Sequence, residues 1–320
     1  MTAEPGPGPE TGAGRFTRLS RAQWAATPAG GPPAGGPPAG GPPAFPRPSQ
    51  VPGVPVTEDD LDAVYRPLVA RLVDRAAAGR RPGPFVVGVT GSVAVGKSTV
   101  ASVLARLLEE RLPGGNVASL STDCFLLPNA ELENRGLLAR KGFPESYDRD
   151  LQRRTLTAIR AGEAPVAVPV YSHEIYDILP DRRDVVEPAG AVVVEGINVL
   201  QAAFDLEGPD GGRSPAGDVS LYVDADEDDI ATWFRARVEH LCRTAPPGGD
   251  GFFSQLAALS PDRLAAVIAT TWTDVNLVNL RRYIAPTRDR ADLVLRTGSD
   301  HRVREVLVRN PGTAPVQPGT

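Results

Sequence analysis

The feature that most constrains the fold is GSVAVGKS (91–98), a glycine-rich segment with the spacing G-x-x-x-x-G-K-S. It follows FVVGVT (85–90), a short apolar run rich in β-branched residues, which is typical of a buried parallel strand. It leads into STVASVLARLLEERL (98–112), whose apolar residues recur at helical spacing. A strand, a glycine loop and a helix in this order predict a phosphate-binding loop in an α/β protein.

Each residue type in this loop has a physical reason to be there. Gly91 and Gly96 let the backbone curl so that several N–H groups converge, and the following helix adds the positive end of its dipole. Lys97, one of only two lysines in the chain, can bind the β- and γ-phosphates, and the Ser98 hydroxyl can ligate Mg²⁺. The residues expected around the phosphates are Gly91, Ser92, Val93, Ala94, Val95, Gly96, Lys97, Ser98 and Thr99. An ordinary glycine turn before a helix is the alternative.

The composition narrows the class of protein. The 320 residues accommodate one large α/β domain or two small ones. A net charge of −5, with arginines interspersed among acids, argues against general nucleic-acid binding. No apolar run reaches membrane-spanning length, and the first ten residues do not have the pattern of a signal peptide. Two cysteines suggest neither a disulfide scaffold nor a zinc site. We therefore expect a soluble cytoplasmic protein that binds neither nucleic acid nor membrane.

The chain divides into five predicted segments. The tails 1–14 and 311–320 are expected to be disordered. Residues 27–55 contain AGGPP repeats, which cannot form a core and predict a disordered Pro/Gly-rich linker. Residues 15–26 carry helix formers and are expected to dock back onto the main domain, which we assign to 56–310.

Strand patterns alternate with helical patterns through the main domain, which predicts a mostly parallel sheet flanked by helices. A second strand is expected to end at Thr122 and Asp123, and a third at Glu195 and Gly196. Further strands are expected within 218–225, 290–298 and 301–309. The carboxyl ends of parallel strands share one crevice. There Asp123 could accept a proton from a hydroxyl nucleophile, and Glu195 could hold Mg²⁺ through water. Helix caps or exposed loop acids are the alternative for either residue.

Phosphoryl transfer also needs positive charge against the transferred group, often from a mobile lid. The helical segment TWFRARVEHLCR (232–243) offers Arg235, Arg237 and Arg243. The pattern does not choose among the three, and a solvated surface position is the alternative for each.

Longer motifs closely resemble the bacterial type I pantothenate kinases. They are, in order, GSVAVGKST (91–99), STDCFLLPN (121–129), RGLLARKGFPESYD (135–148), PVYSHEIYDILP (169–180), EGINVLQ (195–201), LYVDA (221–225) and PTRDRADLVL (286–295). KGFPESYD and VYSHEIYD are far more specific than the phosphate loop. The resemblance implies a homodimeric P-loop kinase that uses ATP and Mg²⁺ to phosphorylate pantothenate to 4′-phosphopantothenate, the first step of coenzyme A biosynthesis.

The resemblance also implies roles for individual residues. Lys97 is expected to act on the ATP phosphates, Asp123 to engage the pantothenate hydroxyl, and Arg237 to be the lid arginine. His301 is expected to stack on adenine. The pantothenate-binding residues that it implies are Tyr171, His173, Tyr176, Phe234 and Asn276.

The chain departs from the family pattern at several positions. Cys124 stands where the family usually has glycine, and Phe234 replaces a tyrosine, so one hydroxyl is lost. Ser102 stands where the family often has an arginine tied to coenzyme A feedback, so we expect weakened feedback inhibition. Val238, Leu241 and TAPPGGDGFF (244–253) occupy a region that is rich in aromatics in the family, although Phe253 is kept.

Two other readings remain open. The chain could be a kinase of the same fold for another small alcohol, such as a pantothenate-like amide, a nucleoside or a sugar phosphate; the altered aromatic region motivates this reading. It could also be a catalytically idle paralog that binds nucleotide or coenzyme A. The presence of Lys97, Ser98, Asp123 and Glu195 argues against an idle copy.

Overall fold

The computed structural model describes residues 14–27, 56–79, 83–112, 115–207, 213–215 and 217–313. The tails and the linker expected to be disordered lie almost entirely outside these ranges.

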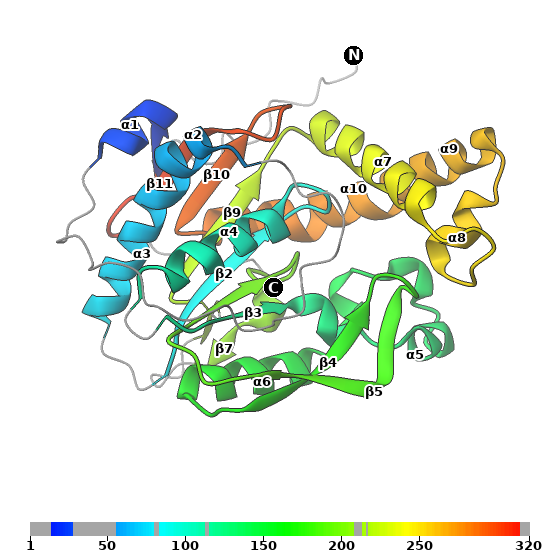
Figure 1. The fold of residues 1–320 in the computed structure, drawn as a ribbon, viewed down its shortest axis with the longest axis horizontal. Coiled ribbons are helices and arrows are strands. Elements are labelled where there is room, and N and C mark those ends of the chain that lie inside the picture. Colours follow the sequence, from blue (N-terminus) through cyan, green and yellow to red (C-terminus); the bar gives the residue numbers. More distant parts are fainter. Residues whose placement is uncertain are drawn as a thin grey trace, which may run out of the picture.

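A seven-stranded sheet forms the centre of the molecule (Figure 1), in the order β1-β11-β10-β9-β2-β6-β3. Its strands are β1 (Phe16–Ser20), β2 (Phe85–Gly91), β3 (Val117–Ser121), β6 (Ala191–Glu195), β9 (Val219–Asp224), β10 (Leu293–Thr297) and β11 (Val303–Arg309). The five strands from β10 to β3 run parallel, and β11 and β1 add an antiparallel edge. The prediction of a mostly parallel sheet is therefore confirmed.

Helices cover both faces of this sheet. The helices packed around it include α3 (Arg66–Ala78), α4 (Lys97–Glu109) and α6 (Arg149–Ala161). Others are α1 (Arg21–Ala26), α2 (Glu58–Asp60), α5 (Asn129–Asn134), α7 (Glu227–Thr244), α8 (Phe252–Ala257), α9 (Pro261–Thr270) and α10 (Leu277–Asn279). Wider π-helical turns join some of them: η1 (Leu61–Tyr65), η6 (Thr271–Asn276) and η7 (Leu280–Ile284). Short 3₁₀ turns are η2 (Thr122–Phe125), η3 (Leu138–Arg140), η4 (Pro144–Ser146), η5 (Ala202–Phe204) and η8 (Ala285–Arg290).

The central strands bury both of their faces, which explains why they are continuously apolar. Val87 and Val193 belong to a core cluster with Leu104 of α4. Val86 and Val192, one residue earlier on the same strands, belong to a second cluster on the other face. Alternate residues of one strand thus pack against different helical layers.

Residues 14–27 join the domain through a strand and a short helix. β1 pairs with β11, from Phe16 opposite Arg309 to Ser20 opposite Glu305. Trp24 of α1 is 1% exposed, and its indole N–H donates to the Val64 carbonyl at 3.1 Å. The sequence pattern indicated helix formers here and missed the strand.

A second structure that the sequence analysis missed is the antiparallel hairpin β4 (Val166–Ser172) and β5 (Asp177–Val186). It forms a separate sheet beside α6 (Figure 1), where β4 contacts η2 and β5 contacts β3. Prolines within both strands weakened the strand signal. A further short ribbon pairs β7 (Leu206–Glu207) with β8 (Arg213–Ser214).

The helices α7, α8 and α9 project away from the sheet (Figure 1). No helix among the described residues is long and apolar enough to cross a membrane.

Candidate functional site

The loop after β2 has the backbone that its glycines predict. Gly91 has φ 143° and Gly96 has φ 97°, both outside the usual range for residues with a side chain. A Cβ on Gly91 would overlap the Val223 carbonyl of the neighbouring strand. Gly96 immediately precedes α4, so the loop ends at a helix N-terminus. Ala94 also has a positive φ, of 60°, which the sequence did not predict.

Lys97 lies over this loop. Its Nζ donates a hydrogen bond of 2.7 Å to the Ser92 carbonyl. Burial lowers the pKa of Lys97, while the carboxylates of Glu195 and Asp123 act in the opposite direction. The cationic group therefore sits within the electrostatic reach of both predicted acids.

Ser98, in the first turn of α4, and Glu195, at the end of β6, come together. Ser98 Oγ donates to Glu195 Oε1 at 3.3 Å. Burial raises the pKa of Glu195, and Lys97 partly offsets this. A hydroxyl and a carboxylate oxygen at one point suit Mg²⁺, which takes its other ligands from water and phosphates. No group of three or more His, Cys, Asp or Glu side chains within the described ranges could hold a metal by itself.

Asp123 lies just beyond β3, in the turn η2, so the strand ends slightly earlier than expected. β3 and β6 are neighbours, and β6 adjoins β2, which places the three predicted strand ends side by side. The residue after β6, Gly196, lies close to Thr122, the residue after β3. This close approach requires glycine, because a Cβ on residue 196 would overlap the Thr122 hydroxyl. The sequence analysis named Gly196 as a strand end and missed this spacing role.

The β4–β5 turn carries the predicted aromatic residues. The ring centroid of Tyr171 is 5.1 Å from that of His173 and 6.1 Å from that of Tyr176. Burial lowers the pKa of His173, with Asp123 opposing, and burial raises the pKa of Tyr171. A neutral imidazole and a protonated phenol therefore face the site at neutral pH, and both can hydrogen-bond to a polar ligand.

Lys141 is a residue of this site that sequence reasoning missed. Its Nζ lies 5.1 Å from the Tyr171 ring centroid and 4.7 Å from that of Tyr176. Burial lowers its pKa to about 8, although Asp177 and Asp123 oppose the shift. The available signal was its rarity: it is the second of two lysines and begins the specific motif KGFPESYD.

α7 brings one of the three candidate arginines to the site. The charge of Arg237 contributes to lowering the pKa values of Lys97 and His173, so this guanidinium lies within their electrostatic reach. Arg235 is exposed, and Arg243 contacts His240. The role of Arg237 as the lid arginine, which the resemblance implied, stays a prediction.

The remaining residues predicted to bind the small alcohol are Phe234, Asn276 and Tyr176, and the three have different surroundings. Phe234 is 8% exposed and packs on Trp272, with 5.9 Å between centroids. Asn276 is half-buried in η6, and no hydrogen bond joins its side chain to another described residue. Tyr176 stacks on Phe252, with centroids 4.7 Å apart and 16° between the planes. The hairpin and α8 therefore meet at this ring.

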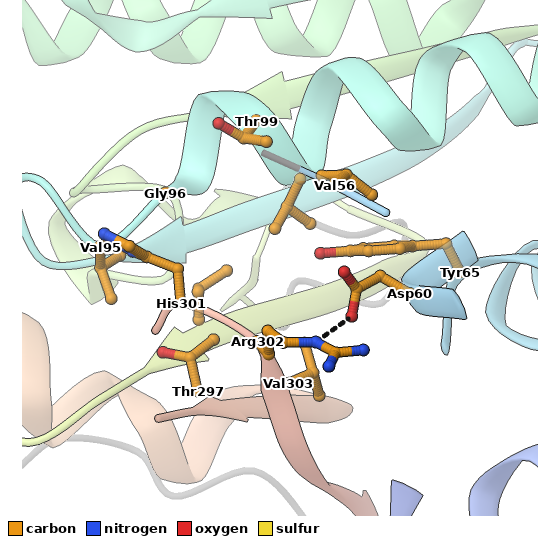
Figure 2. A pocket seen from close by; sticks show the side chains of 12 residues that line it. Val56, Asp60, Tyr65, Val95, Gly96, Thr99, Thr297, His301, Arg302 and Val303 are labelled. Carbon is orange, nitrogen blue, oxygen red and sulfur yellow. Dashed lines mark hydrogen bonds and ion pairs between the residues drawn. The ribbon is translucent and has the colours of Figure 1, made fainter. Parts of the chain in front are cut away.

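A pocket beside the phosphate loop contains His301 (Figure 2). Its labelled lining residues are Val56, Asp60, Tyr65, Val95, Gly96, Thr99, Thr297, His301, Arg302 and Val303. The His301 ring is stacked on Trp233, with centroids 3.7 Å apart. The predicted stacking of His301 on adenine stays a prediction.

Asp60 is an anchor at the rim of this pocket that the sequence analysis missed. Its Oδ1 accepts from Arg302 Nε at 3.2 Å (Figure 2). The same oxygen accepts from Arg21 Nη1 at 2.7 Å. Burial opposes ionisation, but hydrogen bonds from Thr57 and the two arginines keep the pKa of Asp60 well below its usual value. The network ties α1 to the chain beside His301.

Ser102 and Cys124 are two positions at which the chain departs from the family pattern, and neither side chain carries a charge. Ser102 Oγ donates to the Ser98 carbonyl at 2.7 Å, one turn back along α4, and brings no positive charge. Cys124 is buried, and burial raises the pKa of its thiol well above the usual value. The thiol is therefore uncharged and packed.

Comparison with known proteins gives the following similarities. The model of the phosphoribulokinase/uridine kinase family matches residues 86–233. The pantothenate kinase of Streptomyces coelicolor is 48% identical over 230 residues, covering 71% of this chain and 69% of that protein. The pantothenate kinase of Leifsonia xyli subsp. xyli is 43% identical over 272 residues, covering 80% and 84%. The solved structure of D-glycerate 3-kinase from Cryptococcus neoformans is similar in fold alone, with a TM-score of 0.51 and 12% identity over 75% of this chain and 96% of that one.

Proposed function

The chain belongs to the bacterial pantothenate kinase family, and on that basis we propose that it phosphorylates pantothenate to 4′-phosphopantothenate with ATP and Mg²⁺. The observation that supports this most directly is the grouping of Lys97, Asp123 and the β4–β5 aromatic residues around one end of the sheet. Family membership makes the chain a kinase. The role of each residue below is part of the proposal.

The reaction transfers one phosphoryl group. Asp123 accepts the proton of the primary hydroxyl as its oxygen forms a bond to the γ-phosphorus of ATP. The bond from that phosphorus to the β–γ bridging oxygen breaks, and ADP leaves. Lys97, Arg237 and the loop N–H groups stabilise the negative charge that develops on the transferred oxygens.

Ser98 and Glu195 are the residues that would hold Mg²⁺. The ion would neutralise charge on the β- and γ-phosphates. The hydroxyl and carboxylate oxygens already lie 3.3 Å apart and need only to turn towards a shared cation.

The acceptor binds on the hairpin side. Pantothenate carries a carboxylate, an amide and hydroxyls, which suit the polar groups of Tyr171, His173 and Asn276. Lys141 contributes positive charge next to these rings and within reach of Asp123. Tyr176 and Phe234 complete the apolar wall.

The wider biological role follows from the same proposal. The enzyme acts as a homodimer in the cytoplasm and catalyses the first step towards coenzyme A. Coenzyme A is its feedback inhibitor, and it binds weakly because Ser102 is neutral and already hydrogen-bonded within α4. Potent inhibition by coenzyme A, competitive with ATP, would contradict this last point.

A second candidate is a kinase of another small alcohol. Phe234 favours it, since this buried residue has no hydroxyl with which to bind a polar acceptor. Screening pantothenate-like amides, nucleosides and sugar phosphates would reveal such an activity.

The test is ADP release with ATP and Mg²⁺, measured with and without pantothenate. The wild type is compared with Asp123→Asn and with Asp181→Asn, a matched change at an exposed position of β5. Pantothenate-dependent turnover that only Asp123→Asn loses would support both the activity and the base. ATP binding without pantothenate-dependent turnover would overturn the proposal.

A further inference from the structure

Asn129, at the start of α5, contacts three different groups of the acceptor side. Its Oδ1 accepts from Lys141 Nζ at 2.6 Å, and its Nδ2 donates to the Tyr176 carbonyl at 3.2 Å. Its backbone N–H donates to Asp177 Oδ1 at 2.9 Å. One residue thus joins the loop after Asp123 to the β4–β5 turn and to Lys141.

The turn that Asn129 holds is in an unfavourable backbone conformation. Tyr176 has φ 59°, which is uncommon for a residue with a bulky side chain. Its carbonyl accepts hydrogen bonds from both Lys141 Nζ and Asn129 Nδ2. The next residue, Asp177, accepts from the N–H groups of Asn129 and Ile178. A strained conformation persists only where its surroundings hold it, and these contacts do so.

Both groups that Asn129 holds face the acceptor site. The Tyr176 ring contacts Phe252 of α8, so its direction sets where the hairpin meets that helix. The Lys141 ammonium lies over the rings of Tyr171 and Tyr176. A shift of either group would move the wall of the site, whereas no hydrogen bond joins Asn129 to the phosphate loop, all of whose residues 91–98 the structure describes.

We propose that Asn129 is a positioning residue for the phosphoryl acceptor. It fixes Lys141 and the Tyr176 turn, and thereby controls the affinity for the small alcohol. It has no effect on the affinity for ATP. The proposal rests on the proposed function, because it assumes that the acceptor binds on the hairpin side. The side-chain amide suits this role since it provides an acceptor for the ammonium and a donor for the carbonyl at the same time.

Kinetics provide the first test. Asn129→Ala should raise KM for pantothenate about tenfold or more and change KM for ATP less than twofold. Asn134→Ala, at the exposed end of the same helix, is the matched control and should behave as wild type. An unchanged KM for pantothenate in Asn129→Ala, or equal changes in both KM values, would overturn the proposal.

The rarity of lysine allows a second test that does not depend on activity. Protein labelled with ¹³C at lysine Cε gives signals only from Lys97 and Lys141, which Lys141→Arg assigns. The titratable groups that interact electrostatically with Lys141 are the carboxylates of Asp123 from η2 and Asp177 from β5, and the imidazole of His173 from the hairpin turn.

Asn129→Asp places a carboxylate against the ammonium, so the Lys141 titration should move up by at least one pH unit. Asn129→Ala should move it down, and Asn134→Ala should leave it in place. Identical Lys141 titrations in all variants would overturn the proposal. If the titrations shift as expected while pantothenate is not phosphorylated, the positioning contact stands and the proposed substrate fails.

Discussion

The phosphate side and the acceptor side of the site are built in different ways. The proposed phosphate side is one continuous loop, 91–98, which would bind mostly through backbone N–H groups and whose shape depends on two glycines. The acceptor side brings together side chains from η2, the β4–β5 turn, α7 and Lys141. A short motif can therefore specify the first side, whereas the second exists only after distant segments have packed.

The largest expected effect is on kcat, and it comes from a substitution at Gly196, where the phosphate side meets the acceptor side. Gly196→Ala would push against Thr122, which is fully buried and cannot move outward. The change should displace Asp123 relative to the phosphate loop and lower kcat about 100-fold, since misplacement by about 1 Å can cost that much. Steady-state kinetics with pantothenate measure the loss, and ATP binding should persist.

Gly190→Ala is the matched control for this change. It precedes the same strand at its other end, where a Cβ would meet the Asn116 carbonyl at an ordinary 3.6 Å. Equal kcat values for the two variants would show that the spacing at Gly196 does not matter.

The prediction of intermediate size is that kcat/KM for pantothenate depends on pH through Lys141, a residue of the acceptor side. The pKa of Lys141 is lowered to about 8, so the ammonium is present below that pH and is lost as pH rises through it. Because kcat/KM reports ionisations of the free enzyme, its value for pantothenate should fall about tenfold per pH unit above 8.

Lys141→Arg is the control for that profile, because a guanidinium stays protonated throughout the range. The alkaline limb should disappear or move upward in this variant, even if its maximal kcat/KM is lower. A limb that remains at the same pH would assign the titration to another group, such as Lys97.

The smallest effect tests the claim that the phosphate side depends on backbone shape. Ala94 has φ 60°, so Ala94→Gly should keep the loop and change the free energy of unfolding by only about 0.5–1 kcal/mol. Activity should stay within about twofold of wild type, since no functional side chain is lost.

Ala94→Val provides the contrast. A β-branched residue is strongly disfavoured at positive φ, so the variant should lose about 1–3 kcal/mol of stability and much of its ATP binding. Thermal unfolding and ATP titration of both variants measure the difference. Equal behaviour of Gly and Val at this position would contradict a backbone-built site.

The sequence predicted the central sheet and the phosphate loop because their signals are local. Continuous apolar runs indicated buried parallel strands, and the glycines indicated the turn after β2. The hairpin was missed because Pro169 and Pro180 disrupt its strand pattern. Asn129 and Lys141 were missed because their partners lie on other segments, and no spacing along the chain encodes such pairs.

The pairing of β1 with β11 has a consequence for the order in which the molecule forms during its synthesis. Ser20 pairs with Glu305, so after Ser20 a further 285 residues must be translated before its partner has been made. At about 5–20 residues per second, β1 waits roughly 15 to 60 s for its neighbour to be made. The first ordered strand made is thus among the last to find its place, and the nascent chain carries an unpaired strand until nearly the whole domain has left the ribosome.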